Sequence, residues 1–240
     1  MKKGILIEFE GLDCSFKETN SKALKDYIAN KTNREVVLIS YPNYESESSY
    51  FIRQYLGGKY DKDPNNVNPS VSHLFYSLDR YDHWMTKVKP IYDNGGIIVS
   101  DRYTLSNIIY QTAKLEVSDF ANKYKYIEEI KNLEHKVMGL PCPDIAILMD
   151  MPYEISRRLM DKKNADDIHE KSNDYMKHVY STYAFITSMM ERGKIYPNCE
   201  SAIISCNKTR FLIKDKEEIF KNIVDFVDPV LNKLLEGEYE

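Results

Sequence analysis

The sequence has few cysteines, and none are arranged for a disulfide framework or a zinc site. Its 240 residues include four, at Cys14, Cys142, Cys199 and Cys206. None of them forms a CxxC pair, and no cluster of histidine and cysteine has the spacing of zinc ligands. Free thiols are typical of a reducing compartment, so we expect four unpaired cysteines.

Long hydrophobic runs and an excess of positive charge are also missing. No stretch approaches the roughly 18 apolar residues of a membrane-spanning helix, and the apolar run near the N-terminus is too short for a signal peptide. The formal net charge is −4, whereas a general nucleic-acid binder needs a basic face. We therefore expect a cytoplasmic protein whose partners include neither a membrane nor a nucleic acid.

What the sequence does contain is a repeated order of short apolar runs and longer helix-compatible segments. The apolar runs lack the polar alternation of half-buried strands and cover 5–9, 35–41, 97–103, 144–150 and 201–206. Helices are expected over 21–31, 69–95, from about 106, and over 214–235. This order predicts an α/β fold: a single domain over 1–240 with a parallel sheet covered on both faces. Ligands of such sheets bind beyond the carboxyl ends of the strands, where the polar motifs of this sequence lie.

The first of these motifs, "EFEGLDCSFKETN" at 8–20, lacks a glycine that its pattern requires. A phosphate-binding loop is written Gly-x-x-x-x-Gly-Lys-Ser/Thr, connects a strand to a helix, and holds an anion with backbone N–H groups. Gly11 and Lys17 match that pattern, but Phe16 replaces the second glycine and Glu18 replaces the hydroxyl residue. The residues alone leave open a nucleotide site and an ordinary strand-to-helix turn.

Four further segments have both a functional and an ordinary structural interpretation. "SDRY" (100–103) could hold Mg²⁺ through its aspartate and a phosphate through its arginine, or form a surface ion pair. "LFYSLDR" (74–80) places a tyrosine and an arginine on one helix face, where the ring could stack on a base or simply join the core. "SYPNY" (40–44) could line a pocket or form a turn. The charged segment 157–174 could be a lid over phosphates or a solvated face.

Together these motifs are more specific than any of them alone. "FEGLDCSFKET", "YPNY", "LFYSLDR", "SDRYTLSNIIYQ", "PDIAILMD" and "DDIHE" occur in this order, and in that order the chain resembles the thymidylate kinases of the bacterial nucleoside monophosphate kinase group. The resemblance implies transfer of the γ-phosphoryl group of ATP to dTMP, giving dTDP, with Mg²⁺. It also implies a P-loop NTPase-like three-layer fold with a five-stranded parallel sheet, and a homodimer formed through helices.

The resemblance further implies roles for individual residues. The phosphate loop and ATP contacts would be Gly11, Leu12, Asp13, Cys14, Ser15, Phe16, Lys17, Glu18 and Thr19, with Arg158 and Asn207 near the adenine. The dTMP pocket would be lined by Asp13, Tyr41, Tyr44, Tyr76, Arg80, Arg102, Ser106, Asn107 and Tyr110. Lys17 and Arg102 would stabilise the transferring phosphoryl group, and Asp101 would help to place Mg²⁺. In the pocket, the ring at 76 would stack on thymine, the side chains at 80 and 107 would bond its edge, and the ring at 110 would exclude a ribose 2′-hydroxyl.

Several positions depart from the family pattern, mostly on the ATP side. A residue other than glycine at 16 costs roughly 1–2 kcal/mol if the loop needs a positive φ there. Asn43 and Cys14 stand where some members have arginine. The lid offers Lys162 and Lys163, which cannot make the bidentate contacts of arginine. Two alternatives therefore stay open: a catalytically impaired nucleotide-binding relative with a regulatory or scaffold role, and a kinase of another nucleoside monophosphate.

Overall fold

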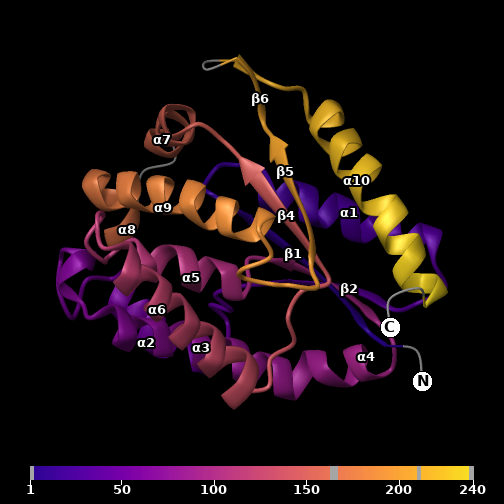
Figure 1. Cartoon of the computed structure of the whole chain (residues 1–240), viewed down its shortest axis with the longest axis horizontal. Helices are drawn as coiled ribbons and strands as arrows, with labels where there is room; N and C mark the ends of the chain where they lie inside the picture. The colour runs from indigo at the N-terminus through magenta and orange to yellow at the C-terminus, as the bar shows by residue number, and fades with distance from the viewer. Residues whose placement is uncertain (1–2, 163–166, 210–211, 238–240) are drawn as a thin grey trace.

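A five-stranded parallel sheet forms the centre of the molecule. The structure, a computed structural model, describes residues 3–162, 167–209 and 212–237. The strand order is β2-β3-β1-β4-β5 and every neighbouring pair is parallel. Helices surround this sheet (Figure 1). The strands are β1 Ile5–Gly11, β2 Val36–Ser40, β3 Ile97–Asp101, β4 Ile145–Asp150 and β5 Glu200–Ser205. The predicted α/β fold is confirmed, and each predicted strand is present with ends that differ by one or two residues.

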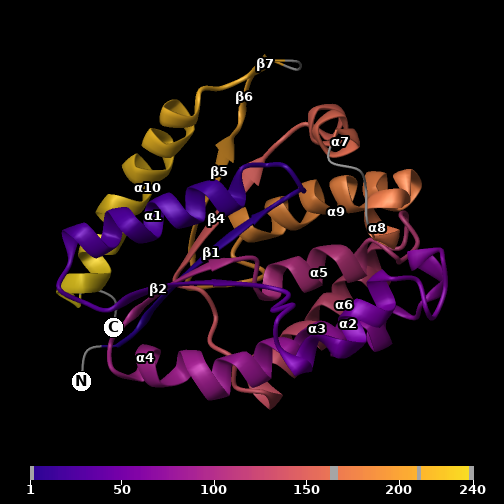
Figure 2. The same cartoon turned by 180° about the vertical axis from the view of Figure 1, so that it is seen from behind.

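Two helices, α1 Lys17–Lys31 and α10 Lys216–Glu236, cover one face of the sheet. Alternate side chains of β1, among them Ile5 and Ile7, pack against both helices in one apolar cluster. Figure 2 shows the two helices side by side on this face, and they contact one another directly. The phosphate loop that connects β1 to α1 is therefore attached to a well-packed layer.

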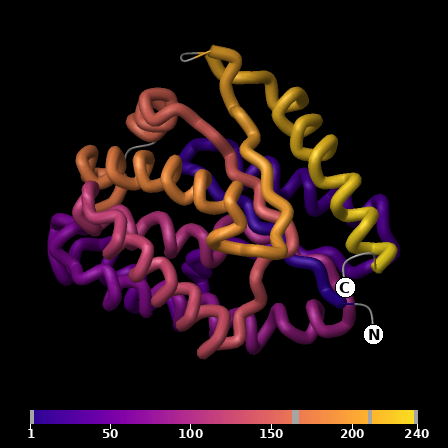
Figure 3. The backbone as a smooth tube through the Cα atoms, in the orientation of Figure 1, coloured from indigo at the N-terminus to yellow at the C-terminus, as the bar shows by residue number. Residues whose placement is uncertain are grey.

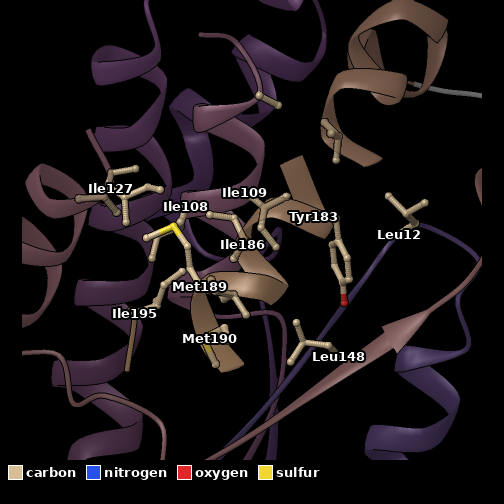
Figure 4. Packing of buried hydrophobic residues seen from close by; sticks show 14 of the residues in the cluster. Leu12, Ile108, Ile109, Ile127, Leu148, Tyr183, Ile186, Met189, Met190 and Ile195 are labelled. Carbon is tan, nitrogen blue, oxygen red and sulfur yellow. The ribbon is translucent and has the colours of Figure 1, made fainter. Parts of the chain in front are cut away.

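The opposite face is covered by α5 Thr104–Thr112, α6 Phe120–Lys131 and α9 Asn173–Glu191. Their apolar side chains form a second cluster with Leu148 of β4 (Figure 4). Because helices bury both faces, all seven residues of β1 are buried. Burial on both faces explains why the inner strands β1, β3 and β4 read as largely apolar, whereas the edge strands β2 and β5 are only partly buried.

The long helical stretch predicted over 69–95 is present, but midway its hydrogen-bond pattern changes from α-helical to π-helical. It consists of α3 Pro69–His83, a π-helical turn η3 Trp84–Val88 and α4 Lys89–Asp93. Pro90 has no N–H group, and its ring would clash with the carbonyl group four residues earlier in a regular helix. A π-turn just before the proline is one of the known ways to accommodate such a break.

Short elements connect these layers, including a strand pair that the sequence did not predict. They are η1 Glu47–Ser49, α2 Tyr50–Leu56, η2 Pro64–Asn66, η4 Asn132–Val137, α7 Tyr153–Asp161, α8 Ile168–Lys171, and the antiparallel strands β6 Asn207–Thr209 and β7 Leu212–Ile213. Figure 3 shows the chain leaving β4 for α7 and returning through α9 to β5. The predicted lid segment 157–174 corresponds to the end of α7, α8 and the start of α9, while Lys163 lies outside the described residues.

Two expectations about the chain as a whole can be compared with the structure. The four cysteines, all in the described part of the chain, form no disulfide. Over 3–162, 167–209 and 212–237, no helix combines the length and the apolar character needed to cross a bilayer.

Candidate active site

The predicted phosphate loop lies between β1 and α1, as the motif requires. A Cβ added to Gly11 would lie 2.5 Å from the Ser15 Oγ and 2.9 Å from the Met149 carbonyl oxygen, so glycine is needed there. The loop then turns through two left-handed residues, Cys14 with φ 62° and Phe16 with φ 66°. The position of the missing glycine thus has the positive φ that glycine adopts most easily.

The Phe16 side chain packs in the interior. It is partly buried against the apolar cluster between the sheet and helices α1 and α10. Full burial of a phenylalanine contributes about 1.5–3 kcal/mol, which is comparable with the roughly 1–2 kcal/mol that a left-handed L-residue costs. The loop therefore keeps its left-handed turn without the second glycine.

Lys17, the first residue of α1, folds back over the phosphate loop. Its ammonium nitrogen lies 3.2 Å from the Leu12 carbonyl oxygen and 3.5 Å from the Asp13 Oδ1. Only 8% of Lys17 is exposed. Glu18 and Thr19, in the first turn of the same helix, are exposed. The positive charge therefore faces the loop, while the Glu18 carboxylate is in solvent near a helix N-terminus, where a negative charge is stabilised.

Arg102 connects the phosphate loop with the pocket beyond it. It follows β3 with φ 64°. One terminal nitrogen lies 2.6 Å from the Asp13 Oδ1, and the other lies 3.1 Å from the Glu10 Oε1. Its Cζ atom also lies 5.2 Å from the centroid of the Tyr110 ring. Burial alone would raise the pKa of Asp13, but the charges of Arg102 and Lys17 hold that pKa below its usual range.

Glu10 is a site residue that the sequence analysis missed. From the buried strand β1, its carboxylate accepts hydrogen bonds from the Gly11 N–H at 2.9 Å, from Arg102 and from the Ser106 hydroxyl. Burial raises the pKa of Glu10, and the charge of Arg102 opposes that shift. The available signal was the presence of Glu8 and Glu10 inside a mostly apolar strand, because a buried charge needs partners.

Asp101 ends β3, in register with Phe9 of the neighbouring β1. Its Oδ1 atom is buried and has no hydrogen-bond partner in the part of the chain that the structure describes. Burial raises the pKa of this carboxyl group, and the charge of Lys17 opposes the shift. Since Mg²⁺ prefers oxygen ligands such as carboxylates, the unpaired oxygen fits the metal role that the resemblance implies.

A cavity of about 100 Å³ lies next to Arg102. Its lining includes all nine residues predicted for the dTMP pocket: Asp13, Tyr41, Tyr44, Tyr76, Arg80, Arg102, Ser106, Asn107 and Tyr110. The lining also includes five residues that were not predicted: Pro42, Leu56, Gln111, Asp167 and His169. Helices α2, α3, α5 and α8 and the segments after β1, β2 and β3 all contribute, so only the folded chain forms this cavity.

The polar wall of the cavity is formed by Arg80, Asn107 and Gln111. The guanidinium of Arg80 donates two hydrogen bonds to Glu134, at 2.7 and 2.8 Å. The amide nitrogen of Asn107 lies 2.8 Å from the same carboxylate. The Gln111 Oε1 accepts a hydrogen bond from the Ser72 hydroxyl at 2.7 Å, and its Nε2 has no partner among the described residues. Each wall residue is thus held from behind and keeps one polar group for a ligand.

His169 of α8 lines the cavity from the side of the predicted lid. Its Nε2 lies 2.7 Å from the Tyr55 hydroxyl, and its ring stacks on Tyr110 at 5.8 Å with 20° between the planes. Burial lowers the pKa of His169 to about 3, so the ring is uncharged at neutral pH. Burial also raises the pKa of Asp167, on the same wall, to about 6.

The predicted adenine contacts are only partly brought together. The Cys206 thiol lies 3.5 Å from the Ser15 carbonyl oxygen, so the end of β5 does reach the phosphate loop. Asn207 lines a second hollow of about 710 Å³, together with Pro152, Tyr153, Glu154, Lys177 and Tyr180. Arg158, on α7, is not among the described residues that line this hollow.

Comparison with known proteins gives one consistent result. The sequence model of the thymidylate kinase family matches residues 9–198. A protein named thymidylate kinase from Plasmodium falciparum (isolate 3D7) is 32% identical over 182 residues, which cover 76% of this chain and 77% of that protein. Another, from Prochlorococcus marinus (strain NATL2A), is 27% identical over 225 residues, or 92% of this chain and 98% of that protein.

The solved structures agree with this result at the level of the fold. The thymidylate kinase of Candida albicans matches with a TM-score of 0.66 and 21% identity, over 97% of this chain and 93% of that chain. This similarity confirms the P-loop NTPase-like fold. Since the family model covers most of the sequence and the Plasmodium relative matches over three quarters of it, the chain belongs to the thymidylate kinase family.

Proposed function

We propose that the protein transfers the γ-phosphoryl group of ATP to dTMP, giving dTDP. One observation carries the proposal: the nine residues predicted for dTMP surround a single cavity, which Arg102 joins to the phosphate loop. Aromatic walls with a few polar groups at one edge suit a nucleobase. A guanidinium beside the cavity suits the phosphate of the same nucleotide.

Phosphoryl transfer would take place between the phosphate loop and Arg102. Lys17 and the N–H groups of the loop would bind the β- and γ-phosphates, and Arg102 would bind the acceptor phosphate and the transferring group. Catalysis of this kind depends on positioning and charge stabilisation, and the acceptor phosphate is already anionic, so no general base is required. In the free protein these cations are paired with Asp13 and Glu10, and the phosphates would replace those contacts.

Asp101 would hold Mg²⁺ directly or through its waters. When bound, the ion would supply positive charge that neutralises the charge developing on the phosphates of ATP. The unpaired Oδ1 of Asp101 supports this role. Glu18 is exposed at the start of α1, and its charge is near enough to raise the pKa of Asp101.

The nucleoside half of the site is the more complete one. Tyr76 would stack on thymine, and Tyr110 would lie beside the 2′-carbon of the sugar. The polar wall offers a donor from Arg80, an acceptor from Asn107 and a donor from Gln111. Thymine presents the complementary series along one edge: the O4 acceptor, the N3–H donor and the O2 acceptor.

The structure gives the non-catalytic alternative no specific support. That alternative rested on Phe16 and on the arginine-poor lid, and Phe16 adopts the left-handed conformation and packs into the core. The second alternative, another acceptor, is a question of specificity at the same site. The Candida albicans enzyme is described as having broad substrate specificity, so several acceptors belong in the test.

A coupled assay of ADP release tests the proposed function. ATP and Mg²⁺ are supplied with dTMP, dUMP, dCMP, dGMP or AMP as the acceptor, and the lysine variant Lys17→Ala is the control for contaminating kinases. We expect the highest kcat/KM with dTMP and no release above background with the variant. Absence of ADP release with every acceptor, or equal rates with dTMP and dCMP, would contradict the assignment.

We also infer that two copies of the chain associate through α3. Five apolar side chains at alternating spacings of three and four residues stay 38–49% exposed on one face of α3 and η3: Val71, Leu74, Leu78, Tyr81 and Met85. This spacing is that of a helix packed against a second helix. Light scattering should show a dimer for the wild type and for Leu212→Asp, a control on β7, but a monomer for Leu78→Asp. A monomeric wild type at micromolar concentration would refute the inference.

A further inference from the structure

A buried ionic cluster lies behind the nucleoside cavity and has no part in the phosphate chemistry. Its centre is Glu134 of η4, which is 0% exposed. Around it lie Arg80, Ser77 and His73 of α3 and Asn107 of α5. Both Arg80 and Asn107 also line the cavity. The cluster therefore joins a buried charge to two groups that face the nucleobase in the proposed function.

The first connection fixes the plane of a guanidinium. Nε of Arg80 donates to the Glu134 Oε2 at 2.8 Å, and Nη2 donates to Oε1 at 2.7 Å. A two-bond pair of this kind sets orientation as well as position. The Nε–H and one N–H of Nη2 are used in this pair, so the donors that Arg80 can offer to the cavity are on Nη1 and the second N–H of Nη2. Arginine has donors and no acceptor, so Arg80 is a donor in any orientation, and Glu134 fixes where that donor points.

The second connection fixes the orientation of an amide. The Asn107 Nδ2 lies 2.8 Å from the Glu134 Oε1 and 3.2 Å from both the His73 carbonyl oxygen and the Ser77 Oγ. The carboxylate and the carbonyl are acceptors only. Turning the amide over would place its oxygen 2.8 Å from a carboxylate oxygen, with no proton between them. The amide nitrogen must therefore face Glu134.

The amide oxygen is consequently left for the cavity. The Asn107 Oδ1 is buried and has no hydrogen-bond partner among residues 3–162, 167–209 and 212–237. An unpaired buried acceptor is costly unless a ligand supplies a donor. The Asn107 Oδ1 is therefore a hydrogen-bond acceptor in the cavity wall, next to the Arg80 donor.

We propose that Glu134 is a positioning residue that selects the nucleobase, because it presents Arg80 as a donor and Asn107 as an acceptor at the same time. This order matches the O4 acceptor and the N3–H donor of thymine and uracil. Cytosine presents the reverse order, with an N4 amino donor and an N3 acceptor, so it meets a donor with a donor and an acceptor with an acceptor. The inference rests on the proposed nucleoside site and adds the residue that determines its hydrogen-bonding pattern.

The electrostatics of the cluster agree with this role. Burial by itself would raise the pKa of Glu134, but the guanidinium of Arg80 and its hydrogen bonds hold that pKa well below the usual range. The carboxylate is therefore ionised at neutral pH. An ionised carboxylate accepts hydrogen bonds only, which is the property that prevents the amide from turning.

Glu134→Gln is the direct test, with affinities for dTMP, dUMP and dCMP measured by calorimetry. Each mispaired buried group costs roughly 10- to 100-fold in affinity, so the wild type should prefer dTMP over dCMP by about 10²-fold or more. A glutamine can turn either its oxygen or its nitrogen towards Asn107. The preference should therefore fall at least about 10-fold in the variant, whereas dTMP and dUMP should be affected alike.

The matched control is Glu8→Gln, which also converts a fully buried carboxyl group into an amide; burial raises the pKa of Glu8. Glu8 accepts a hydrogen bond from the Leu105 N–H and makes no hydrogen bond to Arg80 or Asn107. We expect this variant to keep the wild-type preference. A merely structural role for Glu134 would lower the affinities for all three nucleotides in parallel and leave their ratio unchanged, which would overturn the proposal.

A second variant pair tests the geometry without any nucleotide. Asn107→Asp places two carboxylates against one another and should unfold at a lower temperature than the wild type. Adding Glu134→Gln restores a donor–acceptor pair and the original net charge, so the double variant should regain stability. A double variant no more stable than Asn107→Asp overturns the proposal. If the stability results hold but wild-type protein binds no dTMP, the proposed function fails instead.

Discussion

Replacing Phe16 by glycine and by alanine separates the two contributions of this residue to the phosphate loop. Both variants lose the same contact between the ring and the cluster under α1 and α10. Alanine keeps the left-handed strain of roughly 1–2 kcal/mol. Glycine avoids the strain but costs roughly 0.5–1 kcal/mol more in chain entropy. Phe16→Gly should therefore be more stable than Phe16→Ala by about 0.5–1 kcal/mol.

Comparison of Phe16→Ala with the wild type measures how much the buried ring contributes to stability. Full burial would contribute about 1.5–3 kcal/mol, and the ring is only partly buried, so the loss is smaller. For glycine, relief of strain offsets part of that loss, and we expect a decrease in stability of about 1 kcal/mol. In a chain of this size that corresponds to a fall in Tm of about 2–4 °C.

Urea denaturation of the two variants measures the difference in stability, and calorimetry with ATP and Mg²⁺ measures its consequence for binding. We expect Phe16→Gly to bind ATP at least as tightly as the wild type, because the loop N–H groups remain and the strain is removed. Equal stability of the alanine and glycine variants would refute the left-handed assignment at residue 16. Lack of ATP binding in both the wild type and the glycine variant would make the loop a structural relic.

Three further predictions concern the site. Lys17→Ala should lower turnover by at least about 10²–10³-fold while keeping the rise in Tm that dTMP produces; near-normal turnover would remove Lys17 from the catalytic group. Tyr110→Ala should reduce the kcat/KM preference for dTMP over its ribonucleotide, and an unchanged ratio would remove this ring from the sugar pocket. Asp167→Asn tests the pH dependence of stability, because burial raises the folded-state pKa of Asp167 to about 6. The wild type should lose stability as the pH rises from about 4 through 6, since the buried acid must then ionise. Asparagine does not ionise, so the variant should not lose this stability. The Tm advantage of the variant should thus grow between pH 4 and pH 7, and a constant difference would contradict the burial of this carboxyl group.

The strands of the central sheet could be predicted from the sequence because burial restricts which residue types they contain. A strand buried on both faces is mostly apolar, so β4 reads as an apolar run up to Asp150, and β1 is apolar except at Glu8 and Glu10. The strands β6 and β7 have only three and two residues, which is too short for any period to be visible. The π-turn before Pro90 was hidden for another reason: the apolar spacing on either side of it still fits a helix.

Some residues of the candidate site could likewise be predicted from the sequence, and others could not. Residues inside a motif, such as Arg80 and Asn107, could be assigned to the pocket before the fold was known. Glu134 could not, because its partners lie 54 and 27 positions away in the chain and only the folding of η4 against α3 and α5 joins them. His169 was part of a quoted motif, but its stacking on Tyr110 depends on where α8 lies in the folded chain. Contacts between distant segments leave no periodic trace in a sequence.

Helix α3 borders both the proposed nucleotide site and the inferred dimer contact, so the two binding events would be thermodynamically linked. Tyr76 and Arg80 face the cavity, whereas Leu74 and Leu78 are exposed on the side through which we infer dimer formation. If dTMP tightens the dimer by some factor, dimer formation must tighten dTMP binding by the same factor, because the two effects are one coupling free energy. The affinity of the enzyme for its substrate would then depend on the concentration of the enzyme itself.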